Sequence, residues 1–442
     1  MKLSRFKKLF ALLLASVMAG TAMAGCSNSG SSSTPASSSP SSAEESKAAG
    51  PKEKVLFWYL WSGDTIQRID DLVATYNAQS DKYEVEAVST PDSQKILAAI
   101  AAQNGPDVSD DFSGNVGKYS GTGILEPLDS YIEKSGFDLS NVVPAALTSC
   151  QFDGTTYALP CNINFSALYY NKTLLAEAGY TEPPKTLEEM YEMAVNTTKV
   201  ADDGSLEVLG FPDFPGVYYA DNIAIAAGGG FRNEDGTPAS ADNSGNKLML
   251  KLARDYREKF GLDNVQKFTG GGKYLDPTDP FLLGKQTFRI DGPWMGRSIK
   301  EEFKVDVDYG VTYIPYAEGH ADQEGRALVS SSMLYVPASA ANKEGGFDFA
   351  AYFCGEEGQK AITVAGGDFP CLLTLTDTVQ GYDTDFYAKL AKSANLVSIP
   401  SDTRAGEYDT YVSDQVELCL NLKQDIDTTL QNIANKGAEV FK

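Results

Sequence analysis

The sequence has very little histidine, since His320 is the only one among 442 residues. It stands in the polar segment 317–322, which reads as a surface turn. A metal site built from several histidines is therefore excluded, and a Ser/His or Cys/His catalytic pair would have to use this one residue. We find no indication of a metal site, a cofactor or a catalytic residue.

Positive charge is also scarce. The chain has 37 Lys and Arg against 60 Asp and Glu, a formal net charge of −23, and its basic residues form no cluster. Loss of an N-terminal leader that holds Lys2, Arg5, Lys7 and Lys8 would make the charge −27. Because such a field repels polyanions, we expect no nucleic-acid partner and no attraction to an anionic membrane surface.

The cysteines show no C-x-x-C spacing, and five of the six lie beyond residue 100. An odd number cannot pair completely within one chain. A folded region this long does not depend on disulfides, which favours buried free thiols. Pairing of Cys150 with Cys161, or of Cys354 with Cys371, remains open, and the fifth residue is Cys419.

The N-terminus has the order of a signal peptide. Basic residues precede an apolar run from Leu9 to Ala19, and small residues then lead to Gly25 and Cys26. The run is shorter than the roughly 20 residues that span a bilayer. We predict a signal peptide over residues 1–25 and lipidation of Cys26, since the cleavage region resembles a bacterial lipobox. An ordinary secretory cleavage beside an unmodified cysteine is the alternative.

Residues 27–52 are mostly Ser, with Ala, Gly, Pro and a few charged residues, and they include no large apolar side chain. Such a segment cannot bury enough apolar surface to fold. We interpret residues 26–52 as the lipidated cysteine followed by a disordered tether. The protein is then expected on the extracellular face of the bacterial cell membrane, held there through the lipid anchor only.

The first part of the folded region alternates between strand and helix patterns. Residues 55–60 form a continuous apolar run, which is typical of a strand covered on both faces. Apolar residues then recur at helical spacing over 66–76, alternate over 83–88 and return to helical spacing over 96–100. This β-α-β-α-β series predicts an open parallel sheet, whose ligands bind beyond the carboxyl ends of the strands. We therefore expect ligand-binding residues in segments 61–64 and 110–115.

Later segments carry weaker signals. Thr186 and Glu189 form a capping-box pattern at the start of a helix. We also predict strands over 167–170, 287–290 and 334–336, and helices over 171–178, 247–260 and 347–353. In the C-terminal region, a spacing of three to four residues predicts one packed helical face formed by Leu418, Leu422, Ile426, Leu430 and Ile433.

Several landmarks follow one another in a defined order along residues 54–442. They are FWYLW at 57–61 and the segments 105–108, 123–129, 154–160, 169–172, 183–186, 284–294 and 341–343. Taken together, they resemble family 1 of the extracellular solute-binding proteins of ABC importers, a mostly sugar-binding group similar to maltose-binding protein.

The resemblance implies an α/β, two-lobed periplasmic-binding-protein-like fold of type II. Each lobe would be an open β-sheet flanked by helices, with the ligand cleft between the lobes. The N-terminal lobe is expected over 53–160 plus 317–395 and the C-terminal lobe over 161–316 plus 400–442. The chain would cross between them near 159–164, 312–316 and 395–402.

The function implied is that of a monomeric, lipid-anchored binding component. It would capture a sugar, expected to be an oligosaccharide, by closure of the cleft and deliver it to the permease subunits of an ABC transporter. Binding of a non-sugar solute such as a polyamine or glycerol phosphate is the alternative. A glycoside hydrolase would need a pair of carboxylates that no feature singles out, and an adhesin or spacer would need repeats that are absent.

A sugar site needs aromatic platforms and planar polar side chains. Trp61 and Trp294 fall where the family brings loops to the cleft, whereas Trp58 lies inside the apolar strand. Among polar residues we favour Asp64, which can also cap a helix, and Asp111. The further candidates, each of which could instead be a surface, core or hinge residue, are Asn115, Asn164, Tyr218, Tyr219, Asp291, Asp368 and Arg404.

Overall fold

The computed structural model describes residues 51–442 except 64, 214–217, 380 and 401. The predicted signal peptide, the lipidation site Cys26 and the tether up to residue 50 lie outside the described residues. The candidate Asp64 lies outside them as well. Among the residues described, no helix combines the length and the apolar character needed to cross a bilayer.

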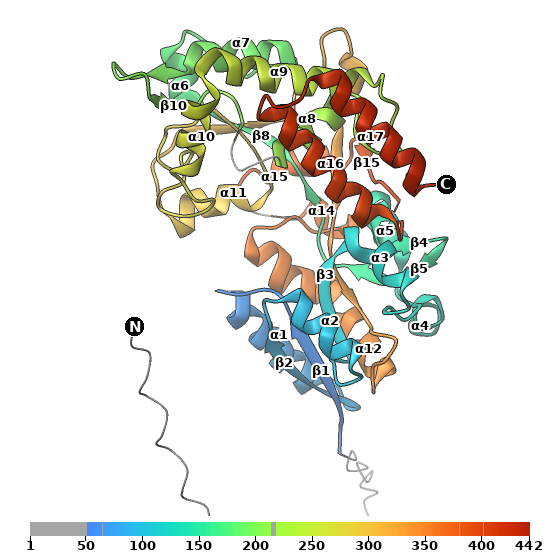
Figure 1. The fold of residues 1–442 in the computed structure, drawn as a ribbon. Helices are drawn as coiled ribbons and strands as arrows, with labels where there is room; N and C mark the ends of the chain where they lie inside the picture. The colour runs from blue at the N-terminus through green and yellow to red at the C-terminus, as the bar shows by residue number, and fades with distance from the viewer. Residues whose placement is uncertain (1–50, 64, 214–217, 380, 401) are drawn as a thin grey trace, which may run out of the picture. The chain divides into compact units, whose positions relative to one another are not determined.

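The first sheet has the strand order β2-β1-β3-β14-β6, and Figure 1 labels its first three strands in the chain, β1, β2 and β3. Strand β1 pairs in parallel with β2 and β3, which confirms the predicted β-α-β-α-β arrangement. A later strand, β14, is inserted antiparallel between β3 and β6. The bounds are β1 Glu53–Tyr59, β2 Tyr83–Ser89, β3 Val108–Phe112, β6 Ala158–Pro160 and β14 Ser332–Tyr335.

The packing on both faces of strand β1 explains why its sequence is apolar without alternation. Phe57 and Tyr59 pack into a core with helices α1 (Thr65–Gln79) and α12 (Lys343–Cys354). Trp58 packs against the opposite core, together with helices α2 (Ser93–Ala101) and α3 (Val116–Gly121). Both faces are therefore covered, as the predicted buried strand required.

The second sheet is antiparallel, with β8 (Ala167–Asn171) between β11 (Phe288–Asp291) and β12 (Tyr309–Thr312). Leu168 joins one core, and its neighbour Tyr169 joins another. The helices around this sheet and along the rest of the chain include α6 Lys172–Glu177, α7 Leu187–Thr197, α8 Tyr218–Ala226, α9 Ser244–Phe260, α10 Leu262–Gly270 and α11 Trp294–Arg297.

Helix α7 begins with the predicted capping box. The Thr186 side chain accepts a hydrogen bond from the Glu189 backbone N–H at 3.2 Å, and the Glu189 carboxylate accepts one from the Thr186 backbone N–H at the same distance. Short strands complete the fold: β7 (Asn164–Phe165) pairs with β13 (Ala327–Ser330), which also pairs with β15 (Leu396–Val397).

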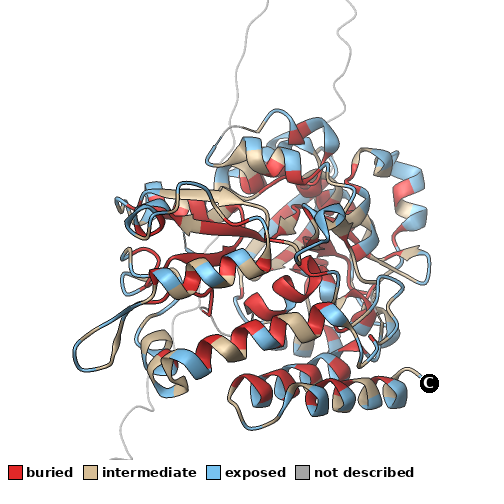
Figure 2. Cartoon of the chain, turned by 90° about the horizontal axis from the view of Figure 1, so that it is seen from above, coloured by how far each residue is buried: buried red, intermediate tan, exposed pale blue. Residues whose placement is uncertain are grey.

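The C-terminal region consists of two helices, α16 (Ala405–Leu420) and α17 (Ile426–Val440). The expected single packed face is therefore interrupted: Leu422 has a φ of +57° in the turn between them, and Leu418 is 36% exposed. The Asp425 side chain caps α17 and starts a new helical direction. Figure 2 shows buried positions recurring along the helix that leads to the C-terminus.

All five cysteines in the described part are buried and free, which confirms the prediction of buried free thiols. Burial raises the pKa of the thiols of Cys150, Cys161, Cys354 and Cys371. The Cys354 and Cys371 thiols donate to the backbone carbonyls of Leu159 and Pro160 on β6, at 3.3 and 3.2 Å. They are protonated core residues.

Candidate functional site

A cavity of about 200 Å³ lies between the loop that follows β1 and the start of α11. Trp61 lines it from the first of these segments and Trp294 from the second. Arg68, Arg297 and Asp368 supply charged groups to its wall. The cavity thus combines two aromatic surfaces with side chains that can donate and accept hydrogen bonds.

Trp61 is held by an aromatic neighbour. Its ring is nearly parallel to that of Phe353, with centroids 5.6 Å apart and an angle of 10° between the planes. Phe353 is fully buried in helix α12, so this platform rests on the apolar core of the first sheet.

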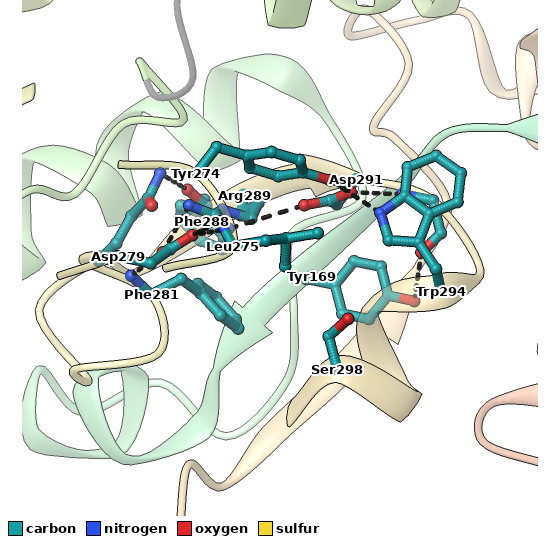
Figure 3. Close-up of polar contacts among 12 residues, drawn as sticks. Tyr169, Tyr274, Leu275, Asp279, Phe281, Phe288, Arg289, Asp291, Trp294 and Ser298 are labelled. Carbon is teal, nitrogen blue, oxygen red and sulfur yellow. Dashed lines mark hydrogen bonds and ion pairs between the residues drawn. The ribbon is translucent and has the colours of Figure 1, made fainter. Parts of the chain in front are cut away.

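Trp294 is held by polar contacts. Its Nε1–H donates to the Tyr274 hydroxyl at 2.7 Å, and that hydroxyl donates to Asp291 Oδ1 at 2.8 Å (Figure 3). The indole also lies against Gly292: a Cβ at this position would come within 2.3 Å of the ring. Glycine is therefore required for the observed placement of the ring.

Asp291 belongs to a buried ion cluster on β11 and the preceding loop. Arg289 donates to both oxygens of Asp279, at 2.9 and 2.7 Å, and its Nη1 lies 3.6 Å from Asp291 Oδ2. Burial raises the pKa of Asp291, while Arg289 and the bonds from Gly292 and Tyr274 act in the opposite direction. The ion pairs and hydrogen bonds compensate for removing these charges from water.

Asp368 lies in the segment that follows the π-helix Gln359–Val364. Burial raises its pKa to about 6, although the positive charges of Arg68 and Arg297 favour the ionised form. Arg68 lies in helix α1 and Arg297 in helix α11. The Asp368 carboxyl is therefore an acceptor whose charge changes near pH 6.

The floor of the cavity is formed where the chain passes between the sheets. Asn162 lines it and is fixed by Ser332, whose backbone N–H donates to Asn162 Oδ1 at 2.7 Å. Thr363 donates to the carbonyl of Cys161 at 2.7 Å, and Ile163 forms a bridge with Phe369. These contacts join several connecting segments at the cavity that Trp61 and Trp294 also line.

Two of the predicted polar residues form a separate cluster. Asp111, buried at the end of β3, accepts hydrogen bonds from Asn115 at 3.0 Å and from the Tyr119 hydroxyl at 2.7 Å. Its Oδ1 also accepts from the Phe112 backbone N–H at 2.7 Å. Both carboxylate oxygens of Asp111 thus accept hydrogen bonds from residues of β3 and of the segment that follows it. The adjacent Phe112 ring, in contrast, is 58% exposed.

The remaining predicted residues lie elsewhere. Tyr219 is buried in a core and meets Phe211 edge to face at 5.9 Å. Tyr218 begins α8, and its side chain lies outside the described part. Asn164 pairs with Ser330 in a two-residue strand. Arg404 forms an ion pair with Asp402 at 2.7 Å and lies over the Phe441 ring near the C-terminus.

The structure therefore brings together Trp61, Trp294 and Asp368 on one cavity, and Asp291 is linked to Trp294 through two hydrogen bonds by way of Tyr274. Sequence reasoning missed Arg68 and Arg297, which lie one helical turn after Thr65 and Trp294 and could have been found from that spacing. It also missed Tyr274 and Phe112. No periodic signal marks Tyr274, because it lies in a loop 17 residues before the carboxylate to which it donates.

Within the described ranges, no group of three or more His, Cys, Asp or Glu side chains has the arrangement of a metal site.

Residues 71–391 match the sequence profile of a family described as bacterial extracellular solute-binding protein. The maltotriose-binding protein of Pyrococcus abyssi is 26% identical over 303 residues, which span 68% of this chain and 62% of that protein. The galactooligosaccharide-binding protein of Bacillus subtilis is 25% identical, over 70% of this chain and 71% of that protein. The sn-glycerol-3-phosphate-binding periplasmic protein UgpB of Brucella melitensis is 22% identical, over 87% and 92%.

Solved structures show the same fold. CpMnBP1 with mannotriose bound has a TM-score of 0.76 at 24% identity and covers 87% of this chain and 99% of its own. The sugar-binding protein MalE from Xanthomonas citri has a TM-score of 0.68 at 20% identity, with coverage of 88% and 97%. The expected α/β periplasmic-binding-protein fold is thereby confirmed.

Proposed function

Because the chain belongs to the bacterial extracellular solute-binding proteins, which are binding components of ABC importers and not enzymes, we propose that it captures a neutral oligosaccharide. The observation that carries this proposal is the cavity between Trp61 and Trp294. Sugar rings present apolar C–H faces that pack on aromatic surfaces and hydroxyl rims that need planar polar partners. Relatives named for maltotriose and galactooligosaccharide binding agree with this solute class.

The polar side chains that would meet the hydroxyls are Asp368, Arg68, Arg297 and Asn162, all of which line the cavity. A carboxylate accepts and a guanidinium donates, so one hydroxyl can bridge them as donor and acceptor at once. Exposed Phe112, at the carboxyl end of β3, is a further candidate platform. Asp64 stays a predicted contact from the sequence.

We further propose that capture closes two lobes, 53–160 plus 317–395 and 161–316 plus 400–442, over the solute. Delivery to the permease would follow from the closed form. Lipidation at Cys26, with a tether over 26–52, would raise the concentration of loaded protein near the transporter. A Cys26→Ser variant should then be released from the cells while it binds solute normally, and retention on the cells would contradict the anchor.

A second candidate is an anionic solute such as a glycerol phosphate. Arg68 and Arg297 both line the cavity, and guanidinium groups bind phosphate well. UgpB, named for sn-glycerol-3-phosphate binding, aligns over 92% of its length. The buried carboxyl of Asp368 in the same wall favours the neutral sugar, because it would repel a phosphate.

Isothermal titration calorimetry on the chain from residue 27 onward tests these alternatives. The panel is maltotriose, mannotriose, galactotriose and sn-glycerol 3-phosphate. We expect one neutral oligosaccharide to bind and Trp294→Ala to weaken binding by about 30-fold, since burial of such a ring stabilises by roughly 2 kcal/mol. Trp58→Phe, outside the cavity, is the control. Binding of the phosphate ester with no binding of any sugar would overturn the proposal.

A further inference from the structure

We propose that Tyr274 is a positioning residue that fixes the orientation of Trp294, and that the buried Asp291 carboxylate acts on the binding cavity through Tyr274. The inference rests on the proposed function, because it assumes that the cavity holding Trp294 receives the solute. It assigns roles to two side chains that do not line that cavity themselves.

The two hydrogen bonds run in one direction, from Trp294 to Tyr274 and from Tyr274 to Asp291. An indole Nε1–H is only a donor, so the Tyr274 oxygen must accept from Trp294 across the 2.7 Å contact. The hydroxyl proton then points to the partner at 2.8 Å, Asp291 Oδ1, which as a carboxylate is only an acceptor. Asp291 therefore orients the hydroxyl, and the hydroxyl orients the indole (Figure 3).

Tyr274 is in turn held by the loop that carries it. The next residue, Leu275, has a φ of +47°, which is unusual for a residue with a side chain, and its backbone N–H donates to Asp279 Oδ2 at 3.0 Å. Asp279 is the partner of both terminal nitrogens of Arg289. The fully buried Asp279 and Arg289 pair thus secures the backbone beside Tyr274, while Arg289 also faces Asp291.

These contacts determine which part of the Trp294 side chain is left to bind a solute. Its Nε1–H is already used by Tyr274, and one side of its ring lies against Gly292. What remains for the cavity is apolar ring surface, suited to the C–H face of a sugar. Holding this surface in place before binding reduces the ordering that association would otherwise require, which increases affinity.

The first test needs no ligand. Two-dimensional ¹H–¹⁵N spectra of the wild-type chain contain indole resonances of Trp58, Trp61 and Trp294, and the resonance missing from Trp294→Phe identifies the last one. In Tyr274→Phe we expect that resonance alone to move and to gain solvent exchange. Tyr180→Phe is the matched control, because its hydroxyl accepts a hydrogen bond from Asn196 at 2.6 Å on an exposed surface.

The second test is a double-mutant cycle with the panel sugar that binds the wild type most tightly. Tyr274→Phe should weaken binding about 3- to 10-fold, the usual effect of one hydrogen bond. In a Trp294→Phe background the same substitution should have no further effect, since no indole N–H remains to be accepted. Tyr180→Phe should leave affinity unchanged in both backgrounds.

The outcomes separate the two proposals. An unmoved Trp294 resonance in Tyr274→Phe would overturn the positioning role, whether or not a sugar binds. An equal loss of affinity in both backgrounds would also overturn it, because Tyr274 would then act independently of Trp294. If no panel sugar binds the wild type, the oligosaccharide proposal fails, and the indole resonance alone decides the role of Tyr274.

Discussion

The two walls of the cavity each present a tryptophan ring, and the two rings are held in place by different kinds of contact. On the first wall, Trp61 stacks on buried Phe353, so a packed apolar core orients the ring. On the second, Trp294 depends on a tyrosine hydroxyl, a buried carboxylate and a glycine without a side chain. Packing is distributed over many atoms, whereas a hydrogen-bond relay depends on each of its members.

The difference has a physical consequence. Loss of one hydroxyl should change the second wall without unfolding the protein, while the first wall can be changed only by damaging the core beneath it. The first wall should therefore couple binding to folding stability, and the second should couple it to local geometry and to ionisation.

The largest effect is expected from Phe353→Ala, which removes the support of Trp61 and leaves a cavity in the core. The free energy of unfolding should fall by roughly 3–5 kcal/mol, and affinity for the sugar should fall with it. Urea unfolding followed by tryptophan fluorescence measures the first quantity. Phe112→Ala, at an exposed position, should lower stability by less than about 0.5 kcal/mol. Equal losses of unfolding free energy in the two variants would show that Phe353 gives no special support; Phe112→Ala is a control for stability only, because Phe112 is itself a candidate platform.

Gly292→Ala should affect the second wall selectively. The new Cβ would approach the indole to within 2.3 Å, so Trp294 must turn away from its place. We expect affinity to fall about 10-fold and the unfolding free energy to fall by about 1–3 kcal/mol, the usual cost of overpacking by an added methyl group. Gly270→Ala in α10, where no heavy atom lies within 4 Å of the added Cβ, is the control. Unchanged affinity in Gly292→Ala would mean that the position of the indole is unimportant.

The smallest effect concerns pH. Asp368 has a pKa raised to about 6 by burial against the opposing charges of Arg68 and Arg297. In the proposed complex the carboxylate would accept hydrogen bonds from the solute above that pH, and this contribution would be lost as the pH falls through 6. Affinity should decrease about threefold between pH 7 and pH 5, the value of one modest hydrogen bond.

Calorimetry of Asp368→Asn across the same range is the check. The amide does not ionise, so its affinity should be independent of pH between 5 and 7. A wild-type affinity that rises on acidification, or an Asn variant that keeps the wild-type pH profile, would exclude Asp368 as the titrating group.

Much of the fold was predictable because it depends on local patterns. The apolar run of β1, the helical spacing of Ile69, Val73 and Tyr76, and the Thr186 capping box all appear as predicted. The C-terminal region was only partly predictable. Its spacing indicated helix correctly but did not reveal the turn at Leu422, because a left-handed residue other than glycine leaves no mark in an apolar pattern.

The candidate site was predictable where it depends on strand ends. Trp61 and Trp294 were expected in loops near the cleft, and the structure places them on one cavity together with Asp368. Asp111 and Asn115 were equally well placed in the sequence, yet Asp111 accepts hydrogen bonds from Asn115 and from Tyr119. All three partners of Asp111 lie within eight residues of it in the chain, yet the spacing alone did not show that the segment after β3 folds back to reach this carboxylate.

The sequence by itself therefore determined the α/β alternation, the covered first strand and the aromatic loops, because periodicity and turn chemistry act over a few residues. Only the tertiary structure decided how each tryptophan is held. Phe353 lies almost 300 residues after Trp61, and Tyr274 reaches Trp294 across a loop and a strand. Contacts of that range arise from the packing of elements against one another, and no local pattern encodes them.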